Sequence, residues 1–161
     1  RCQLIDMLPY TEDDVISYLV NVLKYSEEDA ITYSKLHNSL GSLKRMHEQS
    51  LSTYYDKCTH FIDNIWSVSF GNSLNILKWL KIKKADVDDN EKLDPVLFTQ
   101  CVLNTFHLDC LYEHEKFTWD ELQQNSLFIK ATSKCSTNLL NPLSTKEVTL
   151  HEWLRELTSI E

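Results

Sequence analysis

Glycine and proline are scarce in this sequence of 161 residues, which contains only two glycines and three prolines. Turn-rich β proteins need both residues at their chain reversals, and phosphate-binding loops need clustered glycines, whereas Gly41 and Gly71 stand far apart. The sequence also lacks a P-loop, a dinucleotide-binding Gly-x-Gly-x-x-Gly motif, a His-Glu-x-x-His zinc motif and a Gly-x-Ser-x-Gly nucleophile elbow. These absences exclude the common nucleotide-binding enzymes and favour a helical protein.

Long apolar runs are missing as well, because no stretch reaches the roughly 18–20 apolar residues that a membrane-spanning helix needs. No signal peptide is recognisable, and the chain begins with Arg1 rather than methionine. We therefore expect residues 1–161 to form a single all-helical domain, excised from a longer chain or left by processing.

The five cysteines are odd in number, widely spaced and without a Cys-x-x-Cys pair. They are Cys2, Cys58, Cys101, Cys110 and Cys135. This usage argues against a disulfide framework. No Asn-x-Ser/Thr glycosylation sequon occurs either. Both features favour a reducing intracellular compartment, cytoplasmic or nuclear.

The composition is that of a folded, soluble protein, with 42% hydrophobic and 25% charged residues. The formal net charge of −8 argues against a general attraction to nucleic acid or to anionic lipid. It suits a basic partner instead.

Helix starts are marked by residues that can cap free backbone amide groups. The caps are Thr11, Ser26, Asp94 with Pro95, Thr118 with Glu121, and Ser144 with Glu147. Apolar residues at three- and four-residue steps extend each start into a helix. The predicted helices cover residues 12–23, 26–40, 42–70, 72–82, 95–112, 119–131 and 145–157.

The segments between these helices are short, and Gly41 is expected to stop or kink the chain between the second and third. Residues 132–142 are predicted to form a polar loop, and residues 84–93 an acidic connection. Seven helices without a convincing strand pair predict an all-α fold, a single compact irregular bundle of about seven helices. A short helical solenoid is the alternative.

A metal site is the main chemical alternative in the sequence. On one continuous helix, His107, Cys110 and His114 share a face at the spacing that a single metal ion needs. Cys101 lies on the opposite side, so four ligands would require the helix to break. Half-buried cysteines flanked by histidines explain the same pattern without a metal. We therefore expect no cofactor, and keep these three residues as metal candidates.

Two charged segments have simple structural explanations. Residues 86–94 are rich in acids, but a calcium loop would need glycine at Glu91 and a bidentate glutamate at Leu97. The lysines of residues 78–84 surround Trp79 and could grip phosphates. They also suit a helix C-terminus, whose dipole favours cations. Nucleic acid is therefore not the expected partner.

Aromatic residues make up 11% of the chain, and its seven tyrosines exceed what a small core needs. Tyrosine and tryptophan concentrate at binding hot spots, so some of them are expected on a docking face. The predicted partner-binding residues are Tyr54, Tyr55, Phe61, Ile65, Trp66 and Trp79.

The sequence carries no recognisable catalytic cluster. We therefore predict a non-enzymatic helical interaction domain of a regulatory or scaffold protein. It would bind a basic or amphipathic helix or peptide in an apolar groove. One alternative is a small metal-binding module or enzyme using His107, Cys110 and His114. Others are a self-contained helical virulence or immune-modulating protein that binds a host factor, and a secreted four-helix cytokine.

Overall fold

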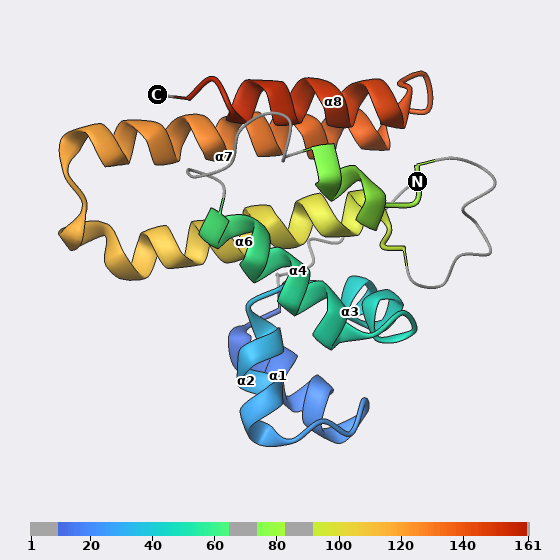
Figure 1. Ribbon diagram of the computed structural model, residues 1–161. Helices are drawn as coiled ribbons and strands as arrows, with labels where there is room; N and C mark the ends of the chain where they lie inside the picture. The colour runs from blue at the N-terminus through green and yellow to red at the C-terminus, as the bar shows by residue number, and fades with distance from the viewer. Residues whose placement is uncertain (1–9, 65–73, 83–91, 161) are drawn as a thin grey trace, which may run out of the picture.

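The computed structural model describes residues 10–64, 74–82 and 92–160 (Figure 1). Within these residues the chain forms seven α-helices and two short 3₁₀ helices. The α-helices are α1 (Glu12–Asn21), α2 (Glu27–Ser34), α3 (Leu40–His47), α4 (Leu51–Asn64), α6 (Pro95–Glu113), α7 (Trp119–Leu140) and α8 (Lys146–Leu157). The 3₁₀ helices are η1 (Leu74–Trp79) and η3 (His114–Lys116). The predicted all-α bundle is confirmed.

Four of the five predicted helix caps are present. Thr11 and Thr118 each form a reciprocal capping box, and the side chain of Ser26 accepts the backbone N–H of Asp29. Asp94 Oδ1 accepts the backbone N–H of Val96 at 2.8 Å and of Leu97 at 3.3 Å. These contacts satisfy amide groups that the first helical turn leaves unpaired, so each helix begins where its cap stands.

The predicted long helix over residues 42–70 is wrong, because the chain breaks between α3 and α4. Ser50 adopts φ 94°, in the left-handed region, and Gly41 lies inside α3 instead of stopping a helix. The backbone N–H of Ser50 donates to His47 O at 3.2 Å after the end of α3, and α4 begins at Leu51. The break turns α4 away from α3.

The predicted loop over residues 132–142 is also wrong, since α7 continues to Leu140. Small polar residues made this stretch look like a loop, yet Thr132 and Ser136 are buried together with Cys135. The indole Nε1–H of Trp153 donates to Thr132 Oγ1 at 3.2 Å. A hydrogen-bonded polar group can be buried at little cost, so these residues form part of the packed face of α7.

Two further predictions are corrected at the ends of elements. The cap of α8 is Thr145, and Ser144 instead donates its hydroxyl to the backbone carbonyls of Asn138 and Asn141, closing the turn between α7 and α8. Residues 74–79 form a 3₁₀ helix rather than an α-helix. It leads into an isolated parallel bridge between Leu80 and Leu93.

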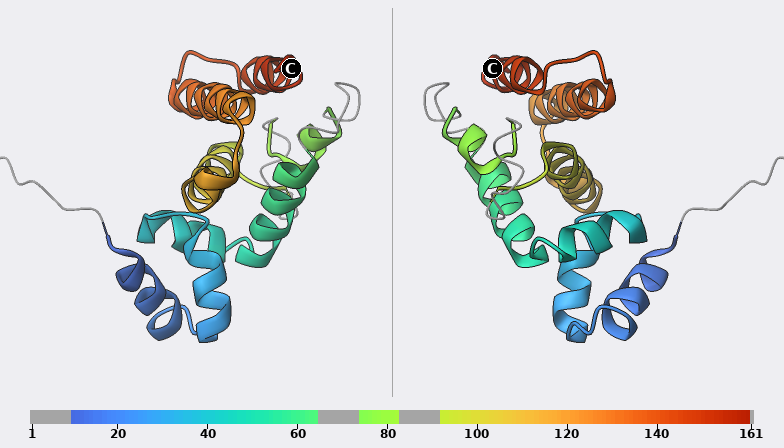
Figure 2. Two further views of the ribbon diagram at one scale, coloured as in Figure 1. Left: turned by 90° about the vertical axis from the view of Figure 1, so that its left-hand side faces the viewer. Right: turned by 90° about the vertical axis from the view of Figure 1, so that its right-hand side faces the viewer.

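Figure 2 looks along α6, α7 and α8, which are stacked one upon the next, with α1 and α2 at the end of the molecule away from α8. Helix α4 packs against α6 from the side. Aromatic rings pack between the helices. The ring centroids of Phe61 in α4 and Trp153 in α8 are 5.2 Å apart, and those of Phe106 in α6 and Phe128 in α7 are 4.1 Å apart. None of the helices in the described ranges is long and apolar enough to cross a membrane.

Candidate interaction surface

Three half-buried tyrosines from different elements meet at the surface where α2 and α4 approach each other. We call Tyr25, Tyr33 and Tyr55 the tyrosine cluster. The ring centroids of Tyr25 and Tyr33 are 5.3 Å apart at 81°, and those of Tyr33 and Tyr55 are 5.9 Å apart at 65°. These are edge-to-face contacts, the geometry that the aromatic quadrupole favours.

Local structure places Tyr25 between two helices. Lys24 adopts φ 65° at the end of α1, which reverses the chain, and the backbone N–H of Tyr25 then donates to Leu19 O at 3.1 Å. Ser26 caps α2 immediately afterwards. The helix carries Tyr33 back past the same turn, so the two rings meet.

Helix α3 supports the cluster through His47. The Tyr25 hydroxyl lies 2.8 Å from His47 Nδ1, and the two rings are 5.5 Å apart at 84°. A hydrogen bond together with an edge-to-face contact fixes the orientation of the tyrosine ring. Contacts from α2, α3 and α4 therefore hold the cluster in place.

Carboxylates lie beside the rings. Burial raises the pKa of Tyr33, and the nearby carboxylates of Asp29 and Asp56 raise it further. The pKa of Tyr25 is raised by burial, by Tyr33 and by Asp29. The raised pKa values keep the phenols of Tyr25 and Tyr33 neutral at pH 7. The surface offers aromatic faces next to negative charge.

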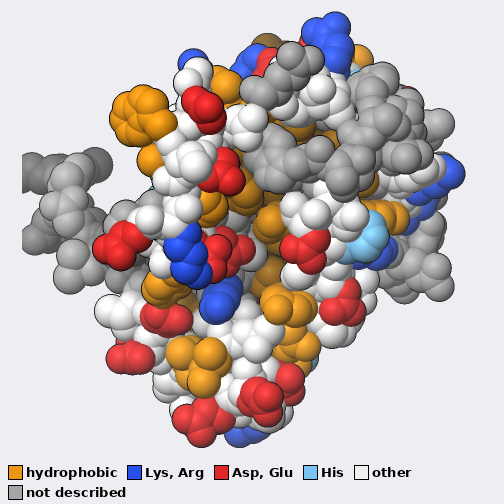
Figure 3. Space-filling view, turned by 60° about the vertical axis from the view of Figure 1, so that its left-hand side comes forward, with side chains coloured by type: hydrophobic (Ala, Val, Ile, Leu, Met, Phe, Trp, Pro, Cys, Tyr) orange, Lys and Arg blue, Asp and Glu red, His pale blue; other side chains and the backbone are white. Residues whose placement is uncertain are grey.

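The negative charge continues from α4 to the end of α6. Burial raises the pKa of Asp109, and the cation of Lys35 opposes this effect. Glu113 and Asp63 raise the pKa of Asp109 further. We call the set of Asp29, Asp56, Asp63, Asp109 and Glu113 the acidic track. Figure 3 views the molecule from the side on which α6 ends and shows acidic side chains spread over this face, with hydrophobic ones between them.

Two predicted partner-binding residues belong to the core instead. Tyr54 is 0% exposed and Phe61 is 2% exposed, so neither offers its ring to a partner in this structure. The Tyr54 hydroxyl donates to Gln49 Oε1 at 2.7 Å and accepts the backbone N–H of Asp94 at 3.0 Å. Helical spacing grouped these aromatic residues on one helix, but it did not show which side of the helix is buried and which is exposed.

The outcome differs among the other four predicted partner-binding residues. Tyr55 belongs to the tyrosine cluster. Trp79 is half-buried and lies apart from the cluster. Its ring centroid is 5.7 Å from that of His60, and Lys57 Nζ lies 5.8 Å from the Trp79 ring centroid. Ile65 and Trp66 lie outside the described residues.

The metal candidates gain no support from the described residues. His107 is exposed, Cys110 is half-buried, and the His114 side chain lies outside the description. Helix α6 ends at Glu113, before His114. No group of three or more His, Cys, Asp or Glu side chains is arranged to hold a metal ion in the part of the chain that the structure describes.

The charged segments are only partly described. Residues 83–91, which hold most of the acidic segment and the last lysines, lie outside the description. Asp94 is described, and it both caps α6 and pairs with Arg45 at 3.1 Å.

The four described cysteines are free thiols. Burial raises the pKa of Cys58 to about 12 and that of Cys135 to about 12. Burial also raises the pKa of Cys101 and of Cys110. Thiols with raised pKa values stay protonated at neutral pH and are poor nucleophiles.

Sequence reasoning did not predict that Tyr25 and Tyr33 meet Tyr55 beside Asp29 and Asp56. The surplus of tyrosines was the available signal, but it named no location. Comparisons of the chain with protein-family models, with curated proteins and with solved structures found no match.

Proposed function

We propose that this protein is a non-enzymatic helical interaction domain of a regulatory or scaffold protein. It binds a basic or amphipathic helix or peptide of a partner protein on the tyrosine cluster and the acidic track. The observation that carries this proposal is the contact of three half-buried tyrosine rings beside the carboxylates of Asp29 and Asp56.

Lysine and arginine side chains match this surface in two ways. A cation over an exposed tyrosine face is stabilised by about 0.5–1 kcal/mol. Neighbouring carboxylates accept charge-assisted hydrogen bonds from the same cation. The apolar stems of these side chains also cover the ring edges. A purely apolar peptide would offer no cation to these carboxylates.

The rings are positioned before binding. Tyr25 is held by His47, and Tyr33 is held between Tyr25 and Tyr55. Ordering a free side chain on association costs about 0.5–1.5 kcal/mol, so a surface fixed in advance loses less entropy. This is a property that binding surfaces share.

The track is longer than one side chain. Asp56 and Asp63 both lie on the exposed side of α4, and Asp63 is near Asp109 of α6. A partner segment with cations at successive turns can therefore engage several carboxylates. Lys35 interrupts the negative charge and favours one acidic residue in the partner opposite it.

We also place the interaction inside the cell, in the cytoplasm or nucleus. The free thiols of the described cysteines support this location, because oxidising compartments favour disulfides. Protonated, buried thiols likewise support a function without covalent catalysis.

Fluorescence anisotropy with two labelled peptides tests the proposal. Both peptides follow the same amphipathic helical pattern, with lysines on the polar face of one and glutamates on that of the other. We expect saturable binding of the basic peptide only, weakened by salt because exposed charges are screened. Equal binding of the two peptides contradicts the proposal.

Matched variants locate the binding. Asp56→Asn removes one carboxylate of the acidic track and is expected to lower the affinity for the basic peptide about two- to fivefold. Asp120→Asn removes an exposed carboxylate from the first turn of α7. Its affinity is expected to equal that of the unchanged protein. Equal losses in the two variants would show that only the overall negative charge matters.

A further inference from the structure

A hollow of about 520 Å³ lies at the end of the seam between α7 and α8. Its volume falls within the roughly 300–1,000 Å³ that small-molecule sites occupy. Leu127 and Ala131 of α7 and Ile160, after α8, supply its apolar lining. Lys130, Lys134 and Glu156 supply its charged lining. The hollow lies on other elements than the tyrosine cluster, so its argument is independent of the proposed function.

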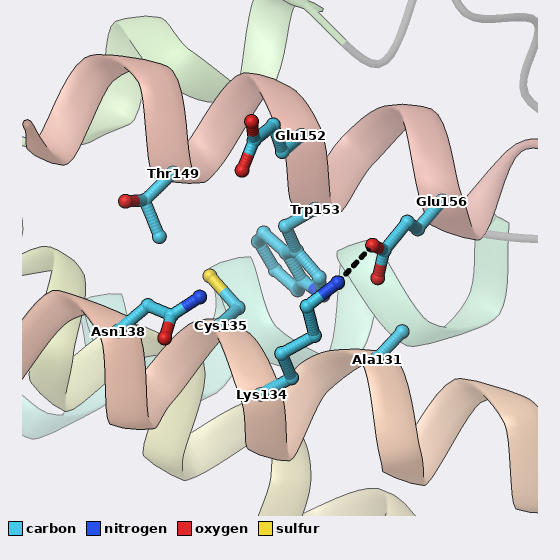
Figure 4. A pocket seen from close by; sticks show the side chains of 8 residues that line it. All are labelled: Ala131, Lys134, Cys135, Asn138, Thr149, Glu152, Trp153 and Glu156. Carbon is cyan, nitrogen blue, oxygen red and sulfur yellow. Dashed lines mark hydrogen bonds and ion pairs between the residues drawn. The ribbon is translucent and has the colours of Figure 1, made fainter. Parts of the chain in front are cut away.

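The ion pair between Lys134 and Glu156 borders both this hollow and a smaller crevice of the same seam, because both residues line both spaces. Figure 4 shows Lys134 of α7 reaching across to Glu156 of α8, with Trp153 behind them. The crevice has space of only about 10 Å³. The crevice is too small for an organic ligand, so a ligand of this seam has room only in the hollow.

The two lysines have different roles. The hydrogen bond and charge of Glu156 raise the pKa of Lys134, which binds that carboxylate across the seam. Among the described residues no carboxylate pairs with Lys130, which is exposed on the adjacent turn of α7. Leu127 is 43% exposed and lies one turn before Lys130 and Ala131. The hollow thus combines an apolar lining with one cation that is available to a ligand.

We propose that this hollow binds a small amphiphile with a single carboxylate, such as a medium-chain fatty acid. The alkyl chain covers Leu127, Ala131 and Ile160, and the carboxylate accepts from Lys130 Nζ. Charge complementarity selects this occupant, because a cationic head group would meet Lys130 with like charge. Each buried methylene group adds favourable transfer free energy, so affinity increases with chain length until the hollow is filled.

Methyl NMR of the full chain tests the proposal, with octanoate and octylammonium as probes that share one alkyl chain. We expect octanoate to shift the methyl signals of Leu127 and Ile160 in a saturable way, and octylammonium to bind more weakly. Absence of saturable octanoate binding overturns the proposal. Equal affinity for the two probes also overturns it, because the contact is then only apolar.

Three variants assign the contacts. Lys130→Gln is expected to lower the affinity for octanoate about two- to fivefold, which is the usual effect of one exposed charge. Lys146→Gln, at the far end of α8, removes an exposed lysine outside the hollow and leaves the affinity unchanged. Leu127→Asn removes an apolar contact at a partly exposed position, so the affinity for both probes should fall. Unchanged octanoate affinity in Lys130→Gln would refute the head-group contact.

Discussion

The hydroxyl of Tyr25, which precedes α2, lies 2.8 Å from Nδ1 of His47, in the last turn of α3. This contact joins the turn after α1 to a helix that is distant in sequence. It also sets the edge of the tyrosine cluster, because the same tyrosine ring packs against Tyr33. The cluster therefore depends on one specific polar contact as well as on ring packing.

Replacing Tyr25 with phenylalanine removes this contact and keeps the ring. We expect Tyr25→Phe to lower the free energy of unfolding by about 0.5–1.5 kcal/mol, the usual net value of one hydrogen bond. Urea denaturation measures the change. Tyr112→Phe is the control, because Tyr112 is 68% exposed and its variant should unfold at the same urea concentration as the unchanged protein. Equal stabilities of all three proteins would show that the hydrogen bond contributes nothing.

Phe61 distinguishes a core residue from a docking residue. Its ring is 2% exposed and packs against Phe98 and Trp153, so Phe61→Ala should lower the free energy of unfolding by about 3–5 kcal/mol. Trp119→Ala removes a larger ring that is 83% exposed and should change the stability by less than about 0.5 kcal/mol. Thermal and urea unfolding report both values. A small loss in Phe61→Ala would place that ring at the surface after all.

His37 gives the protein an acid-sensitive contact. Its Nε2 lies 3.3 Å from Gln100 Oε1, and its Nδ1 accepts the backbone N–H of Ser39 at 2.9 Å. Protonation of the ring would place an N–H at Nδ1, opposite the backbone N–H of Ser39, so this hydrogen bond would be lost. Burial lowers the pKa of His37 below its ordinary value of 6.5, because it disfavours the charged form.

The direction of the pH effect follows from this lowered pKa. The unfolded chain binds the proton more readily, so the stabilisation is complete above pH 6.5 and is lost as the pH falls through the pKa of the folded protein. We expect His37→Gln to reduce the loss of stability below pH 6.5. His107→Gln, at an exposed position, should keep the original slope. Identical slopes in His37→Gln and the unchanged protein would exclude this origin.

Thiol reactivity tests the burial of the cysteines. Among the four described cysteines, Cys110 is the only one that is not fully buried, so it should react first with an alkylating reagent at neutral pH. Cys58 and Cys135 should react slowly until urea unfolds the chain, because burial raises both pKa values to about 12. Peptide mass spectrometry identifies the modified residues. Faster modification of Cys58 than of Cys110 would contradict the packing of α4 against α6.

Local chemistry was readable from the sequence, whereas long-range placement was not. Thr11, Thr118 and Asp94 act on residues two or three positions ahead, so their caps could be predicted from spacing alone. Tyr55 meets Tyr33 only because the chain breaks at Ser50, where a non-glycine residue adopts a positive φ. Periodicity carries no signal for such a break.

The prediction of a loop over residues 132–142, most of which form the second half of α7, was wrong for a related reason. Thr132 is buried because Trp153, from a different helix, supplies its hydrogen-bond partner. Composition reports that a residue is polar, but it does not report a partner that another helix provides. The candidate surface shares this limit in part, since Asp29 lies one turn before Tyr33 on α2, whereas Asp56 reaches Tyr33 from α4.

The most direct test of the central claim is NMR of ring-labelled tyrosines during titration with the basic amphipathic peptide. The account predicts that the signals of Tyr25, Tyr33 and Tyr55 shift together and saturate. Signals of the exposed Tyr10 and Tyr112 should stay in place. Shifts confined to Tyr10 or Tyr112, or no saturable shift within the tyrosine cluster, would contradict the proposed binding surface.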